Sequence, residues 1–91
     1  MALKSYQKPR GRYAEMELAA ALWAKKEGLC LVLEGEGDRR TWTFYCAASG
    51  RQLLTYYPAS LTWIAGPARG KARTWREAVL RAAERREKFL T

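Results

Sequence analysis

The sequence contains no histidine and a single aspartate, Asp38, among its 91 residues. Without histidine, the side chain that most often shuttles protons near neutral pH is missing. The serines, Ser5, Ser49 and Ser60, have no neighbouring base pattern and no glycines of a nucleophile elbow. We therefore expect a protein that is not an enzyme and has no catalytic residues.

Long apolar runs are also missing. The longest, Leu29 to Leu33, is far shorter than the roughly 20 residues that span a bilayer. The first 12 residues carry charges and no apolar segment, so they do not resemble a signal peptide. With 48% hydrophobic residues, the chain has the composition of one globular domain. We expect a cytoplasmic protein with no membrane partner.

Cysteine is scarce: the chain has two, Cys30 and Cys46, with no CxxC pattern and no histidine to complete a metal site. Both lie in expected strands, where a cysteine commonly behaves as a small core residue. A disulfide requires that the two strands pair in a suitable register, and a cytosolic location favours reduced thiols. We expect no metal and no cofactor.

Positive charge is abundant. The chain has 17 basic and 9 acidic residues, a net charge of +8, and most of the basic residues are arginine. Arginine makes bidentate contacts with phosphate, and a large basic excess on a small domain is typical of nucleic-acid binding. A charge that only maintains solubility would give the same count, so charge alone leaves both interpretations open.

The pattern along the chain predicts an α+β domain over residues 13–91, preceded by a basic arm over residues 1–12. A first helix is expected over about 13–27, with Leu18 and Leu22 on one apolar stripe and Met16 and Trp23 on another, so that two sides are covered. Strands are expected over 29–34, 39–47 and 52–57, joined by turns as an antiparallel meander. Residues 61–64 could add a short fourth strand.

A second helix should begin after Thr74, because Thr74 and Glu77 have the spacing of a capping box. Its expected core stripe comprises Trp75, Val79, Ala82, Ala83 and Leu90. The pairs Glu77–Arg81 and Glu84–Lys88 have the spacing of ion pairs on the outer face. The predicted order is therefore α-β-β-β-α.

Three acids, Glu34, Glu36 and Asp38, surround the first expected turn between strands. They are either the ligands of a divalent cation or a solvated turn. A hard cation needs more oxygen ligands at fixed geometry, so we favour the solvated turn.

The stretch "GRYAEMELAAALWAKKEGLCLVL" is similar to the opening of PDDEXK-type nucleases and Holliday-junction resolvases. Those enzymes hold metal through an acidic residue followed by an E-x-K strand, and "RRTWTFYCAASGRQLLTYY" contains no acid. This resemblance therefore implies a non-catalytic relative. The segment "TYYPASLTW" resembles a YYPxSxxW pattern of small uncharacterised proteins from phages and mobile elements, which implies no mechanism.

The α-β-β-β-α order is similar to that of a double-stranded RNA-binding domain, and "RGKARTWREA" resembles the basic start of that family's second helix. The resemblance implies a phosphate-contacting role for Arg69, Lys71, Arg73 and Arg76.

The residues alone suggest a similar site, a basic glycine-containing loop before a helix N-terminus, where backbone N–H groups and the helix dipole favour anions. Gly66 and Gly70 would let the backbone approach a phosphate closely. Trp63 or Tyr57 could stack on unpaired bases. The full set of expected nucleic-acid-binding residues is Arg69, Lys71, Arg73, Arg76, Arg10, Arg12, Arg39, Arg40, Trp63 and Tyr57.

We therefore expect a non-enzymatic nucleic-acid-binding domain that contacts phosphates and has little base specificity. DNA and RNA, single and double strands, all remain open as ligands. The alternative is a phage-type protein-interaction module that docks on a nucleic-acid-processing machine, with exposed aromatic and arginine side chains at its centre.

Overall fold

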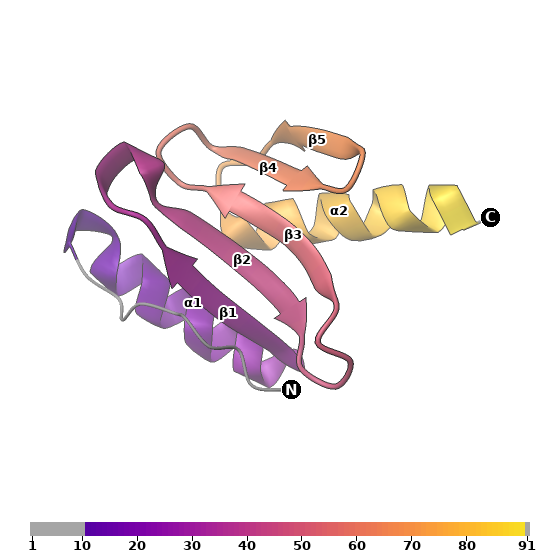
Figure 1. Cartoon of the computed structure of the whole chain (residues 1–91), viewed down its shortest axis with the longest axis horizontal. Helices are drawn as coiled ribbons and strands as arrows, with labels where there is room; N and C mark the ends of the chain where they lie inside the picture. The colour runs from indigo at the N-terminus through magenta and orange to yellow at the C-terminus, as the bar shows by residue number, and fades with distance from the viewer. Residues whose placement is uncertain (1–10, 91) are drawn as a thin grey trace.

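The computed structural model describes residues 11–90, with side chains described to residue 84. It shows an α+β domain with a single antiparallel sheet (Figure 1). In the chain, one helix precedes the strands and one follows them. The elements are η1 (Gly11–Tyr13), α1 (Ala14–Lys26), β1 (Leu29–Glu34), η2 (Gly37–Arg39), β2 (Thr41–Cys46), β3 (Gln52–Tyr57), β4 (Thr62–Ala65), β5 (Ala68–Lys71) and α2 (Trp75–Leu90). The predicted fold class is confirmed.

The sheet is a five-stranded meander whose spatial order is the chain order, β1-β2-β3-β4-β5. Leu33 pairs with Trp42, Trp42 with Tyr56, and Tyr56 with Trp63, so these side chains form one row on one face. Both helices cover this face, because alanines of α1 and α2 pack in the same buried cluster as these residues. In Figure 1 both helices lie behind the sheet. The described elements leave the other face of the sheet without a helix.

The three predicted strands are present, and β2 begins at Thr41 because Gly37–Arg39 forms a 3-10 turn before it. The short fourth strand is present as β4, Thr62–Ala65. A fifth strand, β5, was not predicted and occupies part of the expected basic loop. Gly66, with a φ of 60°, lies in the tight turn between β4 and β5, where a positive φ favours glycine.

Helix α1 contacts the sheet differently from the prediction. Its buried residues are Glu17, Ala20 and Ala24, whereas Leu18 and Leu22 are 55% and 70% exposed. The expectation that this helix is covered on two sides is therefore corrected. Small alanines let the helix backbone lie close to the large aromatic residues of the sheet, so the bulk of the core comes from the strands.

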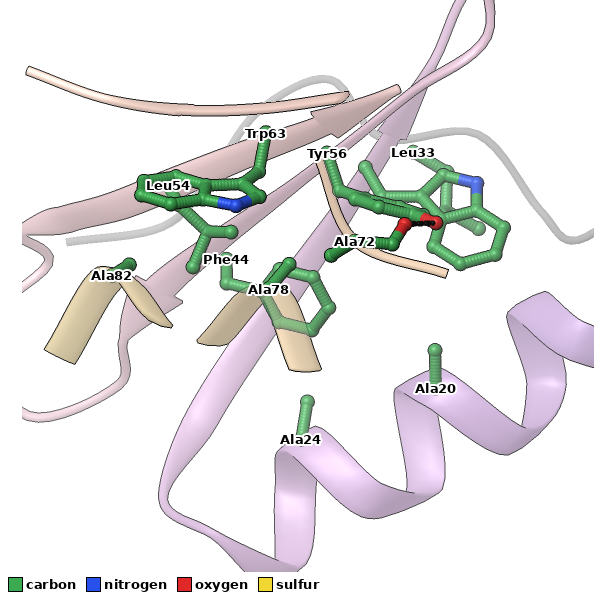
Figure 2. Packing of buried hydrophobic residues seen from close by; sticks show 11 residues of the cluster. Ala20, Ala24, Leu33, Phe44, Leu54, Tyr56, Trp63, Ala72, Ala78 and Ala82 are labelled. Carbon is green, nitrogen blue, oxygen red and sulfur yellow. Dashed lines mark hydrogen bonds between the residues drawn. The ribbon is translucent and has the colours of Figure 1, made fainter. Parts of the chain in front are cut away.

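The core is rich in aromatic side chains. Trp42, Phe44, Tyr56 and Trp63 are each at most 2% exposed, and they pack against alanines of both helices (Figure 2). Figure 2 shows Ala78 and Ala82 of α2 on the same side of the strands as Ala20 and Ala24 of α1. Large aromatic rings of the sheet thus fill the space between the strands and the small residues of the two helices.

Helix α2 begins as its capping residues predict. The Glu77 N–H donates to the Thr74 hydroxyl at 3.2 Å, while the Glu77 carboxylate accepts from the Arg73 N–H at 3.3 Å. The buried stripe is Ala78 and Ala82 with Trp75 and Val79 beside it, and Ala83 is exposed. The ion pair Glu77–Arg81 is present at 3.0 Å. Leu90 and the Glu84–Lys88 pair lie outside the described side chains.

The two cysteines do not form a disulfide. Cys30 pairs with Tyr45 and Cys46 with Leu29, so the two residues are one position out of register. Successive residues of a strand point to opposite faces, which places Cys46 on the helix-covered face and Cys30 on the other. Both are half-buried.

Candidate nucleic-acid interface

Two of the predicted phosphate contacts lie on a strand. Arg69 and Lys71 belong to β5, where they pair with Ile64 and Thr62 of β4. Both side chains are exposed and lie on the helix-free face, because the alternate residue Gly70 pairs with the core residue Trp63. The expected loop is thus an edge strand that holds two cations on one side.

The two expected phosphate-approach glycines have structural roles instead. Gly66 makes the β4–β5 turn, as described above. At Gly70, an added Cβ would lie 3.0 Å from the Trp63 indole nitrogen and 3.1 Å from ring carbons, so the absent side chain makes room for this ring. The expectation that Gly70 admits a phosphate to the backbone is corrected: this position admits a tryptophan.

Lys71 is held in place by its neighbours. Its ammonium donates to the Ser60 carbonyl at 3.0 Å and to the Thr62 hydroxyl at 3.1 Å. It lines an open cleft of about 420 Å³ together with Ser60, Leu61, Ala72, Arg73 and Glu77. This cleft joins the end of β5 to the first turn of α2.

The turn on the other side of this cleft has an unusual backbone. Leu61 has a φ of 58°, in the left-handed region that a branched side chain rarely adopts. Its carbonyl accepts a hydrogen bond from the Ala72 N–H at 2.8 Å, which ties the β3–β4 turn to the segment before α2. Such outliers persist where the surroundings fix them, and they cluster at functional sites.

Two further predicted cations follow directly along the chain. Arg73 and Arg76 are both exposed, and the Arg76 guanidinium lies 5.6 Å from the centre of the Trp75 ring. The one acid in the cleft, Glu77, is paired with Arg81 and accepts from the Arg73 N–H. Four exposed basic side chains therefore lie within eight residues, and we name this set the β5–α2 basic patch: Arg69, Lys71, Arg73 and Arg76.

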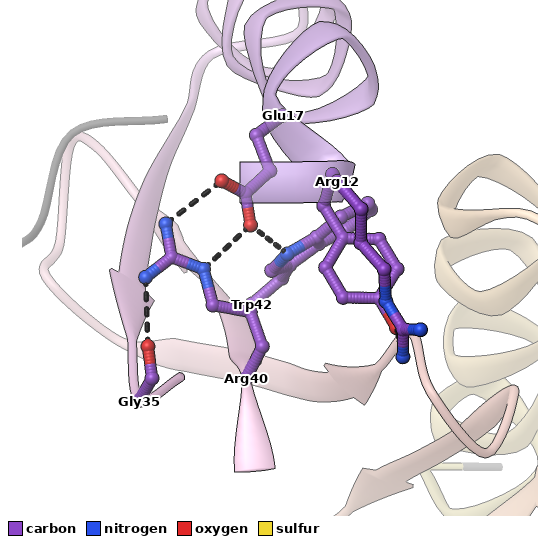
Figure 3. A network of polar contacts seen from close by, with 6 residues as sticks. Arg12, Glu17, Gly35, Arg40 and Trp42 are labelled. Atoms are coloured by element: carbon purple, nitrogen blue, oxygen red, sulfur yellow. Dashed lines mark hydrogen bonds and ion pairs between the residues drawn. The ribbon is translucent and has the colours of Figure 1, made fainter. Parts of the chain in front are cut away.

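Arg40 is a different case and is corrected. It is 2% exposed, and its guanidinium donates two hydrogen bonds of 2.7 Å to the carboxylate of Glu17, which is fully buried (Figure 3). A third N–H donates to the Gly35 carbonyl at 2.9 Å, and Trp42 Nε1 donates to the same carboxylate at 2.6 Å. The hydrogen bond to Glu17 raises the pKa of Arg40. This arginine joins α1 to the sheet and cannot reach a phosphate.

The remaining predicted cations do not join the basic patch. Arg12 forms an exposed ion pair with Asp38 at 3.1 Å and lies 5.0 Å from the centre of the Tyr13 ring. Arg39 is exposed in η2, at the β1 edge of the sheet, whereas the patch lies at the β5 edge. Arg10 lies outside the described residues. The sequence thus predicted several clusters of basic residues. Among the described residues, the β5–α2 basic patch remains as the candidate phosphate-binding cluster.

The predicted aromatic residues divide between the two faces of the sheet. Trp63 is 2% exposed and contacts the helix-covered core, so its expected role in stacking on bases is corrected. Tyr57 pairs with Thr62 on the helix-free face and is half-buried. Tyr45, which the sequence analysis did not select, lies on the same face and is also half-buried. Strand alternation predicts that Trp63 points to the opposite face of the sheet from Thr62 and Ile64. It does not predict which of the two faces the helices cover.

The acidic turn contains the three acids that the sequence analysis considered as cation ligands. Glu34, Glu36 and Asp38 are exposed, and the described part of the chain contains no group of three residues able to hold a metal ion. Within residues 11–90, neither helix is both long and apolar enough to cross a membrane.

Comparisons with known proteins gave no match to a family model, to a curated protein or to a solved structure.

Proposed function

We propose that this domain binds nucleic acid without catalysing a reaction, and that the β5–α2 basic patch contacts the phosphates. The observation that carries the proposal is a set of four exposed cations within eight residues, two on the edge strand β5 and two, Lys71 and Arg73, lining a single cleft. Phosphate contacts of this kind give affinity with little dependence on base sequence.

The arrangement of the patch supports this role. Two hydrogen bonds restrict the Lys71 side chain before a ligand binds, so less conformational entropy is lost on binding. Arg69 extends from the same side of β5, and Arg73 lies at the start of α2, beside Lys71 in the cleft. A phosphate chain that follows the β5 edge would meet these three cations in succession.

The proposal is tested with fluorescence anisotropy on single-stranded and duplex oligonucleotides at several salt concentrations. The variant Arg69→Ala/Lys71→Ala/Arg73→Ala removes three patch charges. The control variant Lys25→Ala/Lys26→Ala/Arg51→Ala also removes three exposed basic charges, from the end of α1 and the β2–β3 turn. Both variants change the net charge from +8 to +5.

We expect the patch variant to lose affinity and its log–log salt slope to fall in magnitude by about 2 to 3, because each phosphate contact contributes about 0.7 to 0.9. The control should keep most of its affinity. Equal losses in the two variants would reduce the effect to overall charge, and absence of binding by the wild type at low salt would refute the proposal.

A second candidate function is protein interaction, and one observation favours it. Leu18 and Leu22 of α1 are neighbours one helical turn apart, and both are largely exposed. Exposed apolar residues that gather on one face mark interaction sites. If no nucleic acid binds, Leu18→Glu/Leu22→Glu is the variant to compare with wild type in capturing proteins from the source cell; equal capture would count against this candidate.

A further inference from the structure

The helix-free face of the sheet has a composition that the basic patch alone does not explain. The pairing register places three rows on it: Glu34, Thr41, Tyr57, Thr62 and Lys71; Val32, Thr43, Thr55, Ile64 and Arg69; and Cys30, Tyr45 and Gln52. Two rows therefore end in a cation of β5. The face contains one acid, Glu34, and it lies at the opposite edge of the sheet.

The half of this face nearest β5 is the more accessible half. Val32 and Thr43, towards β1, are 5% and 6% exposed, whereas Thr55, Thr62 and Ile64 are only partly buried. Tyr57 and Lys71 lie in the same row, two strands apart, which corresponds to roughly 10 Å. A ring surface, an isoleucine and two cations thus lie within the width of three neighbouring strands.

Polar groups around Tyr57 already hydrogen-bond to one another. Thr62 accepts from Lys71, and the Thr43 and Thr55 hydroxyls lie 3.1 Å apart in a mutual bond. Threonine side chains are short, so the threonines beside Tyr57 extend less far from the sheet than its ring does. A surface with one aromatic ring and an apolar neighbour suits the face of a planar group.

The charges indicate what kind of planar group would fit. A ligand on this face would place negative charge towards Arg69 and Lys71, and away from Glu34, which is about four strand spacings or roughly 19 Å from Lys71. A single nucleic-acid strand has this polarity, with anionic phosphates on one side and uncharged bases on the other. In a duplex the base faces are stacked inside the helix, so they are not available to the Tyr57 ring.

On these grounds we propose that the ligand is single-stranded nucleic acid lying on the helix-free face, with a base stacked on Tyr57 beside Ile64 and phosphates along Arg69 and Lys71. This inference rests on the proposed function and adds the strand type and a stacking residue. Stacking of a base on an aromatic side chain tolerates every base, in agreement with binding of low sequence specificity.

The test measures anisotropy of labelled oligothymidine, oligouridine and a duplex with the same number of phosphates. Oligonucleotides of about 12 nucleotides fall within the site sizes of single-strand-binding folds. The proteins are wild type, Tyr57→Ala, Tyr57→Phe and Tyr45→Ala. Tyr45→Ala is a matched control, because it removes the same ring from the same face, two rows away from Lys71. Circular dichroism melting confirms that each variant is folded.

We expect wild type to prefer at least one of the two single strands over the duplex by about tenfold or more. Tyr57→Ala should weaken single-strand binding by about 5- to 150-fold, the range of one stacked base, and change duplex binding less than about twofold. Tyr57→Phe should retain the wild-type affinity, and Tyr45→Ala should lose less than Tyr57→Ala. Comparison of the two single strands identifies which of the two strands, DNA or RNA, the protein prefers.

Duplex binding as tight as single-strand binding would overturn this inference and leave the phosphate-contacting function standing. So would a Tyr57→Ala variant that is folded and binds single strands like wild type, or equal losses in Tyr57→Ala and Tyr45→Ala. No binding of any oligonucleotide by wild type at low salt would instead refute the proposed function itself.

Discussion

Arg39 and Arg40 are adjacent in the chain and have opposite environments. Arg39 is exposed in η2, while Arg40 is buried with both of its Glu17 contacts at 2.7 Å. The sequence pair shows no difference between them, because the burial of Arg40 depends on a glutamate 23 residues earlier on another element. An isolated buried charge is very unfavourable, so Glu17 and Arg40 depend on each other.

We predict that Arg40→Met lowers the free energy of unfolding by about 3 to 5 kcal/mol, because it leaves the Glu17 carboxylate buried without its cation. Arg39→Met should change this free energy by no more than about 0.5 kcal/mol, as is usual for an exposed site. Urea denaturation of the two variants measures the difference. Similar values for the two substitutions would contradict the buried ion pair.

Tyr56 gives a prediction for pH dependence. Its hydroxyl donates to the Ala72 carbonyl at 2.8 Å, and burial, followed by the charge of Glu77, raises the pKa of this phenol above 10.0. The folded state thus favours the protonated phenol. Its contribution to stability is complete below pH 10.0 and falls as pH rises through the higher pKa of the folded state.

Tyr56→Phe should therefore cost about 0.5 to 1.5 kcal/mol near neutral pH, the net value of a hydrogen bond. The difference from wild type should shrink above pH 10.0 as the tyrosine of the wild type ionises. Urea denaturation of both proteins on each side of that pH gives the two differences. A difference that stays constant or grows would show that the hydroxyl is not preferentially protonated in the folded state.

At the scale of elements, β5 is the strand that the sequence did not predict. Its four residues, Ala-Arg-Gly-Lys, have no β-branched or aromatic side chain, and strand propensity largely reflects such side chains. The strand exists because Ala68 and Gly70 are small enough to lie against the core beside Trp63. The helices and the three longer strands carry clear signals in apolar periodicity, glycine turns and helix capping, and these were predicted correctly.

The proposed binding surface includes the same strand that the sequence did not predict. A basic segment before a capped helix could be identified from the sequence, and its cations are indeed exposed. That Arg69 and Lys71 share a face with Tyr57, while Trp63 lies on the other face, follows from the β3–β4–β5 register. Register is set by the turns and by which side chains the core buries, and a shift of one residue exchanges the two faces of a strand.

Gly70→Ala tests the position of β5. The added methyl group would press on the Trp63 ring, which is part of the core, and overpacking of this kind costs about 1 to 3 kcal/mol. Ala68→Gly in the same strand provides a comparison that removes a methyl group and adds no contact. We expect Gly70→Ala to lower the melting temperature and to change the tryptophan emission, to which Trp63 contributes. An unchanged emission spectrum with unchanged stability would contradict the close packing.

At the scale of the whole molecule, the sheet separates the two thiols. Cys30 and Cys46 lie on neighbouring strands but point to opposite faces, and their Cβ vectors cannot be joined by a disulfide without moving the backbone. We predict that under a mild oxidant the folded monomer keeps both of its thiols reduced, whereas the urea-unfolded chain forms an intrachain disulfide. Mass spectrometry after alkylation counts the thiols in each state. An intrachain disulfide formed under native conditions would contradict the β1–β2 register.

The strands lie in the sheet in the same order as in the chain, and this affects how the protein folds during its synthesis. Each strand pairs with the strand before it, so no strand must wait for a distant segment, and the loops closed on folding are short. Proteins dominated by such local contacts fold rapidly. During synthesis the sheet can therefore grow hairpin by hairpin as the chain leaves the ribosome, and α2, which follows the sheet in the chain, then covers the exposed edge of the aromatic core.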